Sequence, residues 1–365
     1  MSLLRTRRFA TFWWATLLSN IGTWVQQVAE PWLLLSLGAS PFLIGLDSFA
    51  MNAPVWLLTL IGGLLADRAD RRHVIVLFQS VQMLCPTLIV ALLLTGSVQP
   101  FLIIILSLVV GITDALSMPS FQSIVPSIVD REQIPQGVAL NSTQFNLSRI
   151  LGPAIAGALM ASMGAVACFA LNAASYIPFI GIALWILPRG VPKPVDGDAF
   201  DRRHPFAGLK EIARAPHFRG ALLTVFATSF FCDPLVTFIP VLVRGAFQGD
   251  ASQFSAAVAA FGVGGLFGAL GLLAVPANQD RRRWSSRLAV GYGLAVVLIA
   301  LLPWLWGLPA LMMFAGATMT MSNTSANTLL QATVSPSDAW TDCEPLHARD
   351  ARRASTGWRV DGSLD

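Results

Sequence analysis

The stretch GGLLADRADRRHVIVLF, residues 62–78, places a short charged segment between two apolar runs. Five of the six residues from Asp67 to Arg72 carry a formal charge, whereas the flanking residues are mostly Leu, Ile and Val. Charge concentrated in this way marks a polar turn between two segments that avoid water. The rest of the chain repeats the arrangement, with long apolar runs separated by short polar connections.

The composition indicates a polytopic membrane protein. Of the 365 residues, 55% are hydrophobic and 12% are charged, and the mean hydropathy is +0.64. About 20 consecutive apolar residues span a bilayer, and the runs are continuous rather than alternating with period two, which argues against a β-barrel. We therefore predict an all-α bundle, with boundaries uncertain by about four residues. The ten predicted spans are 10–36, 42–66, 73–95, 100–122, 138–163, 165–187, 218–243, 253–275, 287–306 and 308–331.

The basic residues predict the orientation of these spans. They cluster near the N-terminus, from Arg68 to Arg72, between Arg189 and Arg219, and from Arg281 to Arg287. Each of these clusters follows an even number of predicted spans, counted from the N-terminus. The intervening short connections carry no charge. Because basic loops favour the cytoplasmic side, the N-terminus is predicted to be cytoplasmic, and Arg244 is the one basic residue placed clearly on the opposite side.

Several other protein classes are disfavoured. The net charge of +4 reflects membrane orientation, because no basic stripe interleaved with aromatic residues predicts a nucleic-acid partner. The first helix is too long for a signal peptide and is expected to be retained. Cys85, Cys168 and Cys232 lie in predicted helices and Cys343 in the tail, so neither a disulfide framework nor a metal site is expected. No cofactor is predicted.

A polar interval divides the chain into two halves. Residues 188–217 are rich in Pro, Gly and mixed charges and are predicted to be a cytoplasmic linker. It separates a six-helix bundle, residues 1–187, from an incomplete bundle of about four helices, residues 218–331. The two halves show weak sequence similarity to one another, for example between GGLLADRADRR and LGLLAVPANQDRRR. Such duplicated halves are a recurrent plan of secondary transporters.

The charged turn resembles the loop between helices two and three of the major facilitator superfamily, in its bacterial exporter branch. The resemblance covers about residues 5–336, and Asp70 stands where that family usually has Gly. The glycines at 62 and 63 allow close helix contact. The resemblance implies a multi-pass transporter of the bacterial inner membrane, with a gating role for Gly63, Asp67, Arg68, Arg71 and Arg72. On the alternative interpretation, the arginines only anchor the topology.

A second motif favours export. RILGPAIAGAL, residues 149–159, resembles the Gly-Pro motif of helix five that is typical of antiporters in the superfamily, through Gly152, Pro153 and Gly157. Proline removes a backbone donor and bends a helix, and glycine allows neighbouring helices to pack closely. Ordinary transmembrane packing is the alternative explanation for the glycines.

Ionisable groups at membrane depth are rare and usually face a cavity or a partner. We predict Glu30, Asp114 and Asp233 as proton-coupling or substrate-contact residues, with Arg149 as a candidate partner. Asp47, near the start of the second predicted span, is instead expected in the wet interface. Polar and aromatic residues including Gln26, Trp24 and Phe145 are candidates to line a pathway for an amphiphilic ligand, although the aromatic residues alternatively face lipid.

The tail, residues 332–365, is polar and is not expected to cross a membrane, whereas the resemblance implies two further spans. Codons for the tail can be chosen so that a shift of one base yields LMRGRTVSLYMLAMR, which resembles the missing loop and helix start. We therefore expect a frameshift near Pro336, with a divergent tail as the alternative.

The predicted function is export of a small amphiphilic molecule, such as a siderophore or a drug-like compound, by proton-coupled alternating access. The expected partners are that small molecule, protons and the lipid bilayer, and the chain is expected to act as a monomer. The alternative is a truncated, transport-inactive membrane protein with at most an interaction role. An enzyme is disfavoured, because the sequence contains no phosphate-binding loop, zinc pattern or nucleophile elbow and therefore predicts no catalytic residues.

Overall fold

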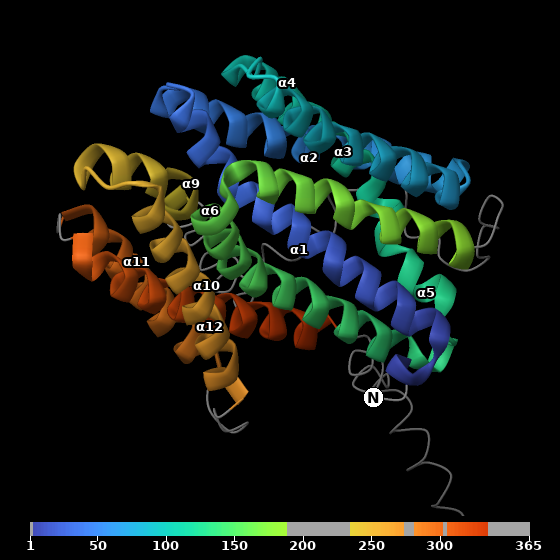
Figure 1. Cartoon of the computed structure of the whole chain (residues 1–365). Coiled ribbons are helices and arrows are strands. Elements are labelled where there is room, and N and C mark those ends of the chain that lie inside the picture. The colour runs from blue at the N-terminus through green and yellow to red at the C-terminus, as the bar shows by residue number, and fades with distance from the viewer. Residues whose placement is uncertain (1–2, 188–233, 274–280, 302–304, 335–365) are drawn as a thin grey trace, which may run out of the picture.

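The computed structural model describes residues 3–187, 234–273, 281–301 and 305–334 (Figure 1). Within these ranges every regular element is a helix. The all-α fold is therefore confirmed. Asp233, the predicted linker 188–217 and the tail from residue 335 lie outside the described residues.

The N-terminal helices follow the predicted spans closely. The elements are η1 (Leu3–Arg5), α1 (Arg7–Ser36), α2 (Pro41–Arg68), α3 (Arg71–Leu94), α4 (Pro100–Gln122), α5 (Ile124–Ile128), η2 (Arg131–Gln133) and α6 (Ile134–Ile186). Inside α6, Gly164 has φ 74° and ψ −171°, a backbone conformation that is open essentially only to glycine. This break divides α6 into two helical segments, at the point where the sequence predicts the boundary between two spans.

The C-terminal helices are α9 (Pro234–Val241), a π-helical turn η4 (Leu242–Ala246), α10 (Ala251–Leu273), α11 (Arg281–Leu301), η5 (Leu305–Gly307) and α12 (Leu308–Val334). By length and apolar composition, 6 described stretches suffice to cross a membrane, in α2, α3, α4, α6, α10 and α11. α1 and α12 are not among them. Both carry many polar side chains, such as Gln26 and Glu30 in α1 and Ser322 and Asn323 in α12. The count of ten spans stays a prediction.

The helices form two groups that meet along α6 and α10. In the first group α1 packs on α6, α2 on α4, and α3 on both α4 and α6. In the second, α12 packs against α10 and α11. Contacts between α6 and α10 join the groups, and α9 touches α1 and α2 (Figure 1).

Glycines bring several of these helices into backbone contact. A Cβ atom added at Gly264 or Gly268 of α10 would collide with the backbone of Met313 or Ala317 in α12. In α2, a Cβ at Gly62 would lie 2.6 Å from the carbonyl oxygen of Ala115 in α4, whereas Gly63 faces open space. The expectation of close contact is therefore right for Gly62 and wrong for Gly63. Small residues are the usual means of close helix association in a membrane.

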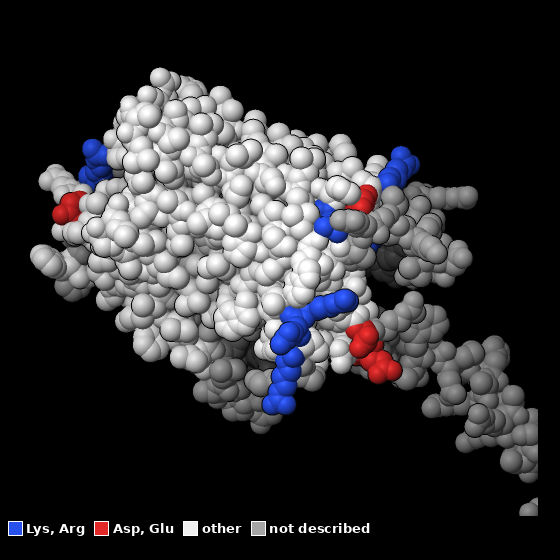
Figure 2. Space-filling view, turned by 45° about the vertical axis from the view of Figure 1, so that its right-hand side comes forward, with Lys and Arg blue, Asp and Glu red and all other residues white. Residues whose placement is uncertain are grey.

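The exterior is apolar. Figure 2 shows a broad band without charged side chains between charged groups at the two ends of one face. Large apolar side chains are exposed, among them Trp56 at 88% and Leu57 at 75% in α2. Such a surface is suited to hydrocarbon and not to water.

Asp250 fixes the start of α10 through a reciprocal pair of hydrogen bonds. Its carboxylate accepts from the backbone N–H groups of Ser252 and Gln253, each at 3.0 Å, and its own N–H donates to Gln253 Oε1 at 2.8 Å. This is a capping box. The Ser252 hydroxyl and the backbone donors hold the pKa of Asp250 below its usual value. The cap therefore stabilises the fold above the ordinary pKa of an aspartate, and this contribution is lost as the pH falls through the depressed value.

Replacing Gly264 with Ala tests the packing of α10 on α12. The added methyl group meets the Met313 backbone, so we expect a loss of about 1–3 kcal/mol in the free energy of unfolding. Gly293→Ala in α11 is the matched control, because a Cβ there meets no atom within 4 Å. Better helix propensity should leave that variant as stable or up to about 1 kcal/mol more stable. Thermal unfolding of both variants in detergent makes the comparison, and equal losses would contradict the packing described.

Candidate functional site

Glu30 lies inside the first group of helices, held by side chains from two of them. Its exposed fraction is 3%, and it precedes Pro31 near the end of α1. Gln26 Nε2 donates to Glu30 Oε2 at 3.0 Å, and the hydroxyl of Ser107 in α4 donates to Oε1. Both oxygens therefore have a fixed partner in a site away from water.

Asp47 is the second acidic group at this site. It is 5% exposed, its Oδ1 has no hydrogen-bond partner, and its side chain lies within hydrogen-bonding reach of Glu30 and Ser107. The expectation that Asp47 sits in the wet interface is therefore wrong. Two buried carboxylates within reach of one another would repel if both were ionised, so the pair is suited to hold one proton.

A hydrogen-bonded chain extends from Glu30 along α1 to α6. Asn172 Nδ2 donates to Gln26 Oε1 at 2.6 Å, and Ser175 Oγ donates to the Asn172 carbonyl at 2.7 Å. The Tyr176 hydroxyl lies within reach of Asn172 and of Thr23. Buried polar groups linked in this way hold one another in place.

Asp114 lies near this group of polar residues but is exposed. It follows Ser107 by seven residues, about two helical turns, and so shares a face of α4. Its side chain is exposed and within hydrogen-bonding reach of Gln82 in α3, which accepts from Gln79 Nε2 at 2.9 Å. A pocket of about 230 Å³, open space included, lies between these helices and is lined by Gln26, Gln82, Asn172 and Tyr176 among others.

Arg149 occupies a different place, near the middle of the first segment of α6. Its Cζ atom lies 5.7 Å from the centroid of the Trp24 ring, and Trp24 meets Phe145 edge-on at 6.1 Å. Arg149 also lines a pocket of about 360 Å³, open space included, whose other walls come from α10 and α12. The structure thus places Glu30 inside the first group of helices, Asp114 at an exposed position within reach of Gln82, and Arg149 at the junction of the two groups of helices.

The helix-five motif makes contacts in two directions. A Cβ at Gly152 would collide with Trp24 of α1, whereas one at Gly157 would lie 2.5 Å from the Ser255 carbonyl oxygen of α10. On the other side of the junction, a Cβ at Gly262 would lie 2.5 Å from the Ala154 nitrogen. Pro153 lies inside α6 between these contacts. The motif therefore sits where α6 meets α10.

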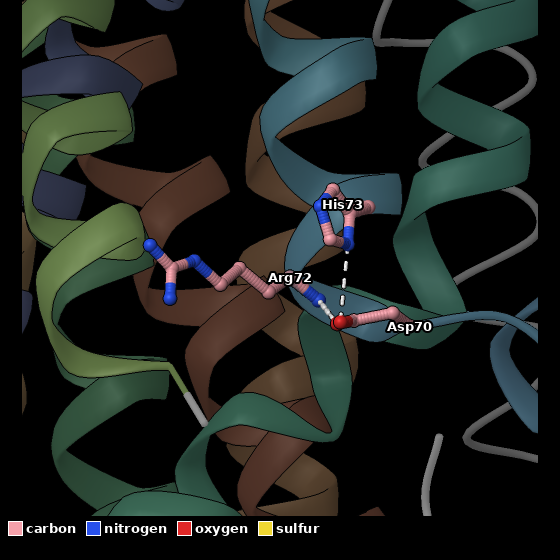
Figure 3. A network of polar contacts seen from close by, with 3 residues as sticks. All are labelled: Asp70, Arg72 and His73. Atoms are coloured by element: carbon pink, nitrogen blue, oxygen red, sulfur yellow. Dashed lines mark hydrogen bonds and ion pairs between the residues drawn. The ribbon is translucent and has the colours of Figure 1, made fainter. Parts of the chain in front are cut away.

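The charged turn between α2 and α3 is held by local hydrogen bonds. Asp70 caps α3 by accepting from the Arg72 N–H at 2.9 Å and pairs with His73 at 3.0 Å, while the Arg72 side chain points away from it (Figure 3). The Arg71 side chain donates to the Ala66 carbonyl at 3.4 Å. Asp70 has φ −65° and ψ 111°, which requires no glycine. The Asp67 side chain lies outside the described part, and the gating roles of this turn stay predictions.

Near the Ser36 end of α1, contacts among the described residues connect α1 and α2 with η4, α9 and α10. Arg244 Nη1 donates to the Leu35 carbonyl at 3.0 Å, and Trp32 stacks on Phe254 with ring centroids 4.7 Å apart. Phe238 of α9 approaches Gly45 of α2. The C-terminal end of a helix carries partial negative charge and attracts cations, so this contact is favourable for Arg244.

Comparisons with known proteins identify the family. A family profile described as a transmembrane secretion effector matches residues 1–344. The chain belongs to this family of the major facilitator superfamily. Among its relatives are the staphyloferrin A transporter of Staphylococcus aureus, 27% identical over 71% of this chain, and the enterobactin exporter EntS of Shigella boydii, 28% identical over 91%. The matches span 65% and 79% of those proteins, so this chain covers slightly less than two thirds of the first.

Solved structures share the fold of this major facilitator protein. The nucleoside transporter NupG aligns with a TM-score of 0.62 at 16% identity, over 90% of this chain and 84% of that one. A bacterial homologue of the human lysosomal transporter Spinster, in an inward-facing state, aligns with a TM-score of 0.60 at 17% identity, over 92% and 77%.

Sequence reasoning missed Asp47 and Ser107 as members of the site. A signal for Asp47 was available, because Glu30 lies nine residues before Ala39 and Asp47 eight residues after it. In two antiparallel helices, residues equidistant from the turn lie at the same depth. For Ser107 the sequence carries no comparable signal, since serine is common in transmembrane helices.

Arg244→Gln tests the contact at the end of α1. Because Arg244 is exposed, its loss should cost little stability but should let the ends of α1 and α9 separate more often. Spin labels at Ser40 and Gln248, in a background without native cysteines, should then report a longer or broader distance distribution. Arg287→Gln, an exposed arginine of α11, is the matched control. Superimposable distributions for Arg244→Gln and the parent would refute the joining role.

Proposed function

We propose that this chain exports a small amphiphilic molecule, of the siderophore or drug-like class, by proton-coupled alternating access in the bacterial inner membrane, with its N-terminus in the cytoplasm. The observation that carries the proposal is the buried pair of Glu30 and Asp47, bonded to Gln26 and Ser107 inside an apolar bundle. Family membership and the names of the relatives support the transported class. Asp233 remains a further candidate for coupling.

The proton would bind between the two carboxyl groups. With the proton bound, the pair carries one negative charge, and with the proton lost it carries two, which a site shielded from water disfavours. A conformational state that admits water from one side can therefore release the proton there, and the opposite state can reload it from the other side. The hydrogen-bonded chain through Gln26 and Asn172 links this change to α6, where the antiporter-like motif lies.

Movement between the states would occur at the junction of α6 and α10. The close contacts around Gly157 and Gly262 involve small residues, which allow two helices to rock without displacing long side chains. In repeat-built transporters, alternating access is largely a rocking of one bundle against the other around a central site. The pocket at this junction is where the cargo would sit.

Glu30→Gln tests the coupling role. The amide keeps the size of the side chain but does not exchange the proton, so proton-driven efflux from vesicles should fall by about tenfold or more. Enterobactin and staphyloferrin A are the first cargoes to assay, together with an amphiphilic dye. Glu132→Gln, at an exposed position before α6, should transport like the parent.

Two results would count against the proposal. Undiminished efflux by Glu30→Gln would show that Glu30 is not required for proton coupling. Failure of the parent chain to move any of the cargoes would favour the alternative of a transport-inactive membrane protein with an interaction role.

A further inference from the structure

Three exposed arginines lie at the start of the chain without a counter-charge. Arg5 ends η1, Arg7 and Arg8 open α1, and all three are exposed. No ion pair joins any of them to a residue that the structure describes. The first acidic residue of the sequence is Glu30, which is buried in the bundle. Three positive charges are therefore free to meet an anion from outside the chain.

The backbone that carries these arginines is fixed to the bundle. Leu3 is 2% exposed and shares a buried apolar cluster with Phe9 and Ile124. The backbone N–H and the hydroxyl of Thr6 both donate to the Leu3 carbonyl, at 3.1 and 2.7 Å. Chain termini are poorly ordered unless they are tied down in this way. The three arginines are therefore presented at one place on the surface and not on a loose tail.

The outer face of α1 changes in character along its first three turns. Arg7, Thr11, Trp14 and Leu18 follow one another at spacings of four, three and four residues, and so share one face of the helix. Arg7 is exposed, Thr11 is half-buried, and Trp14 and Leu18 are 63% and 43% exposed. The face thus passes from a cation through a polar and an aromatic group to an aliphatic one. This is the order in which a phospholipid presents its phosphate, its interface and its acyl chains.

The Trp14 ring sets the depth of this face in the membrane. It meets the Trp13 ring edge-on at 4.9 Å, and Trp13 is fixed because its Nε1 donates to the Leu140 carbonyl at 2.9 Å. Exposed tryptophans of membrane proteins gather at the level of the headgroups. Arg7 lies seven residues, or about 10 Å along the helix, farther toward the water. Its side chain is long enough to reach the phosphates from there.

We propose that this surface, called the Arg7 patch and defined by Arg5, Arg7, Arg8, Thr11, Trp14 and Leu18, binds an anionic phospholipid such as phosphatidylglycerol. The guanidinium groups hold the phosphate, for which their fork of N–H donors is well matched. A lipid with a cationic headgroup is disfavoured, because its charge meets three positive charges. A soluble phosphate is disfavoured as well, because it leaves the contact surface of Trp14 and Leu18 unused. The inference concerns the lipid around the protein and does not depend on what the chain transports.

Bimane attached to Leu18→Cys, in the full chain without native cysteines, reports which lipid lies beside the patch. The protein is reconstituted in phosphatidylcholine that contains a small fraction of doxyl-labelled phosphatidylglycerol or, separately, of doxyl-labelled phosphatidylcholine. The ratio of the two quenching efficiencies gives the enrichment of the anionic lipid at this position. We expect an enrichment of about fivefold, the gain typical of a single arginine near an anionic headgroup.

Leu57→Cys in α2 is the matched probe position. Leu57 is 75% exposed and lies eleven residues before Arg68, as Leu18 lies eleven residues after Arg7. Asp67 and Asp70 balance part of the positive charge near Arg68. Enrichment at Leu57 should therefore stay within about twofold.

Substitutions assign the enrichment to the arginines. Changing Arg5, Arg7 and Arg8 together to Gln should abolish the preference at Leu18, whereas changing all three to Lys should keep about half of it or more, because the charges remain. Should the triple Gln variant fail to purify, Arg7→Gln alone should lower the enrichment by about twofold or more. Inorganic phosphate should weaken the preference no more than sodium chloride of the same ionic strength does.

Three results would overturn the inference. The first is equal quenching by the two lipids at Leu18 in the parent chain. The second is a preference that survives in the Gln variants. The third is a loss of preference specific to inorganic phosphate, which would show that the patch binds the free ion in place of a lipid.

Discussion

The structure depends on one constraint, which is that the outward-facing side chains of the helices meet hydrocarbon rather than water. In such surroundings an unpaired polar group is expensive, so helices satisfy the backbone and the polar side chains turn inward toward one another. The structure shows both consequences of this constraint, an apolar exterior and a polar, hydrogen-bonded interior. Large apolar residues such as Trp56 are exposed, whereas Glu30, Gln26 and Asn172 are buried in a single hydrogen-bonded chain.

The same constraint changes how the helices are held together. Burial of apolar surface gives no advantage over lipid, so association relies on close contact and on polar bonds. Close contact is seen in the α10–α12 pair, where Gly264 and Gly268 lie against the backbone of α12. Close contact is also seen at the α6–α10 junction, at Gly157 and Gly262. Small residues at the points of closest approach let the two helices meet tightly, and they place no long side chain there to hinder movement between the two bundles.

The acidic pair and the pocket lined by Arg149 lie in two different parts of the structure. Glu30 and Asp47 both lie within reach of the Ser107 hydroxyl of α4, and Arg149 lies over Trp24 where α6 faces α10 and α12. α1 connects them, because Trp24, Gln26 and Glu30 lie on adjoining turns of this helix.

Much of the fold was predictable from the sequence, because a run of apolar residues long enough to cross a membrane has few other interpretations. The break at Gly164 followed from a lone glycine between two such runs. The faces of the helices were less predictable. Sequence position gives the depth of a residue, but the neighbour it meets depends on the rotation of its helix. For this reason Asp47 was misplaced in the interface, and Gly63 was expected in a contact that only Gly62 makes.

Quenching of tryptophan fluorescence by lipids brominated along their acyl chains tests the central claim most directly. Single-tryptophan variants that retain either Trp56, 88% exposed in α2, or Trp13, 7% exposed in α1, would be reconstituted into such lipids. The account predicts strong quenching of Trp56 and little quenching of Trp13. Equal quenching of the two, or an unquenched Trp56, would show that hydrocarbon does not surround this bundle as described.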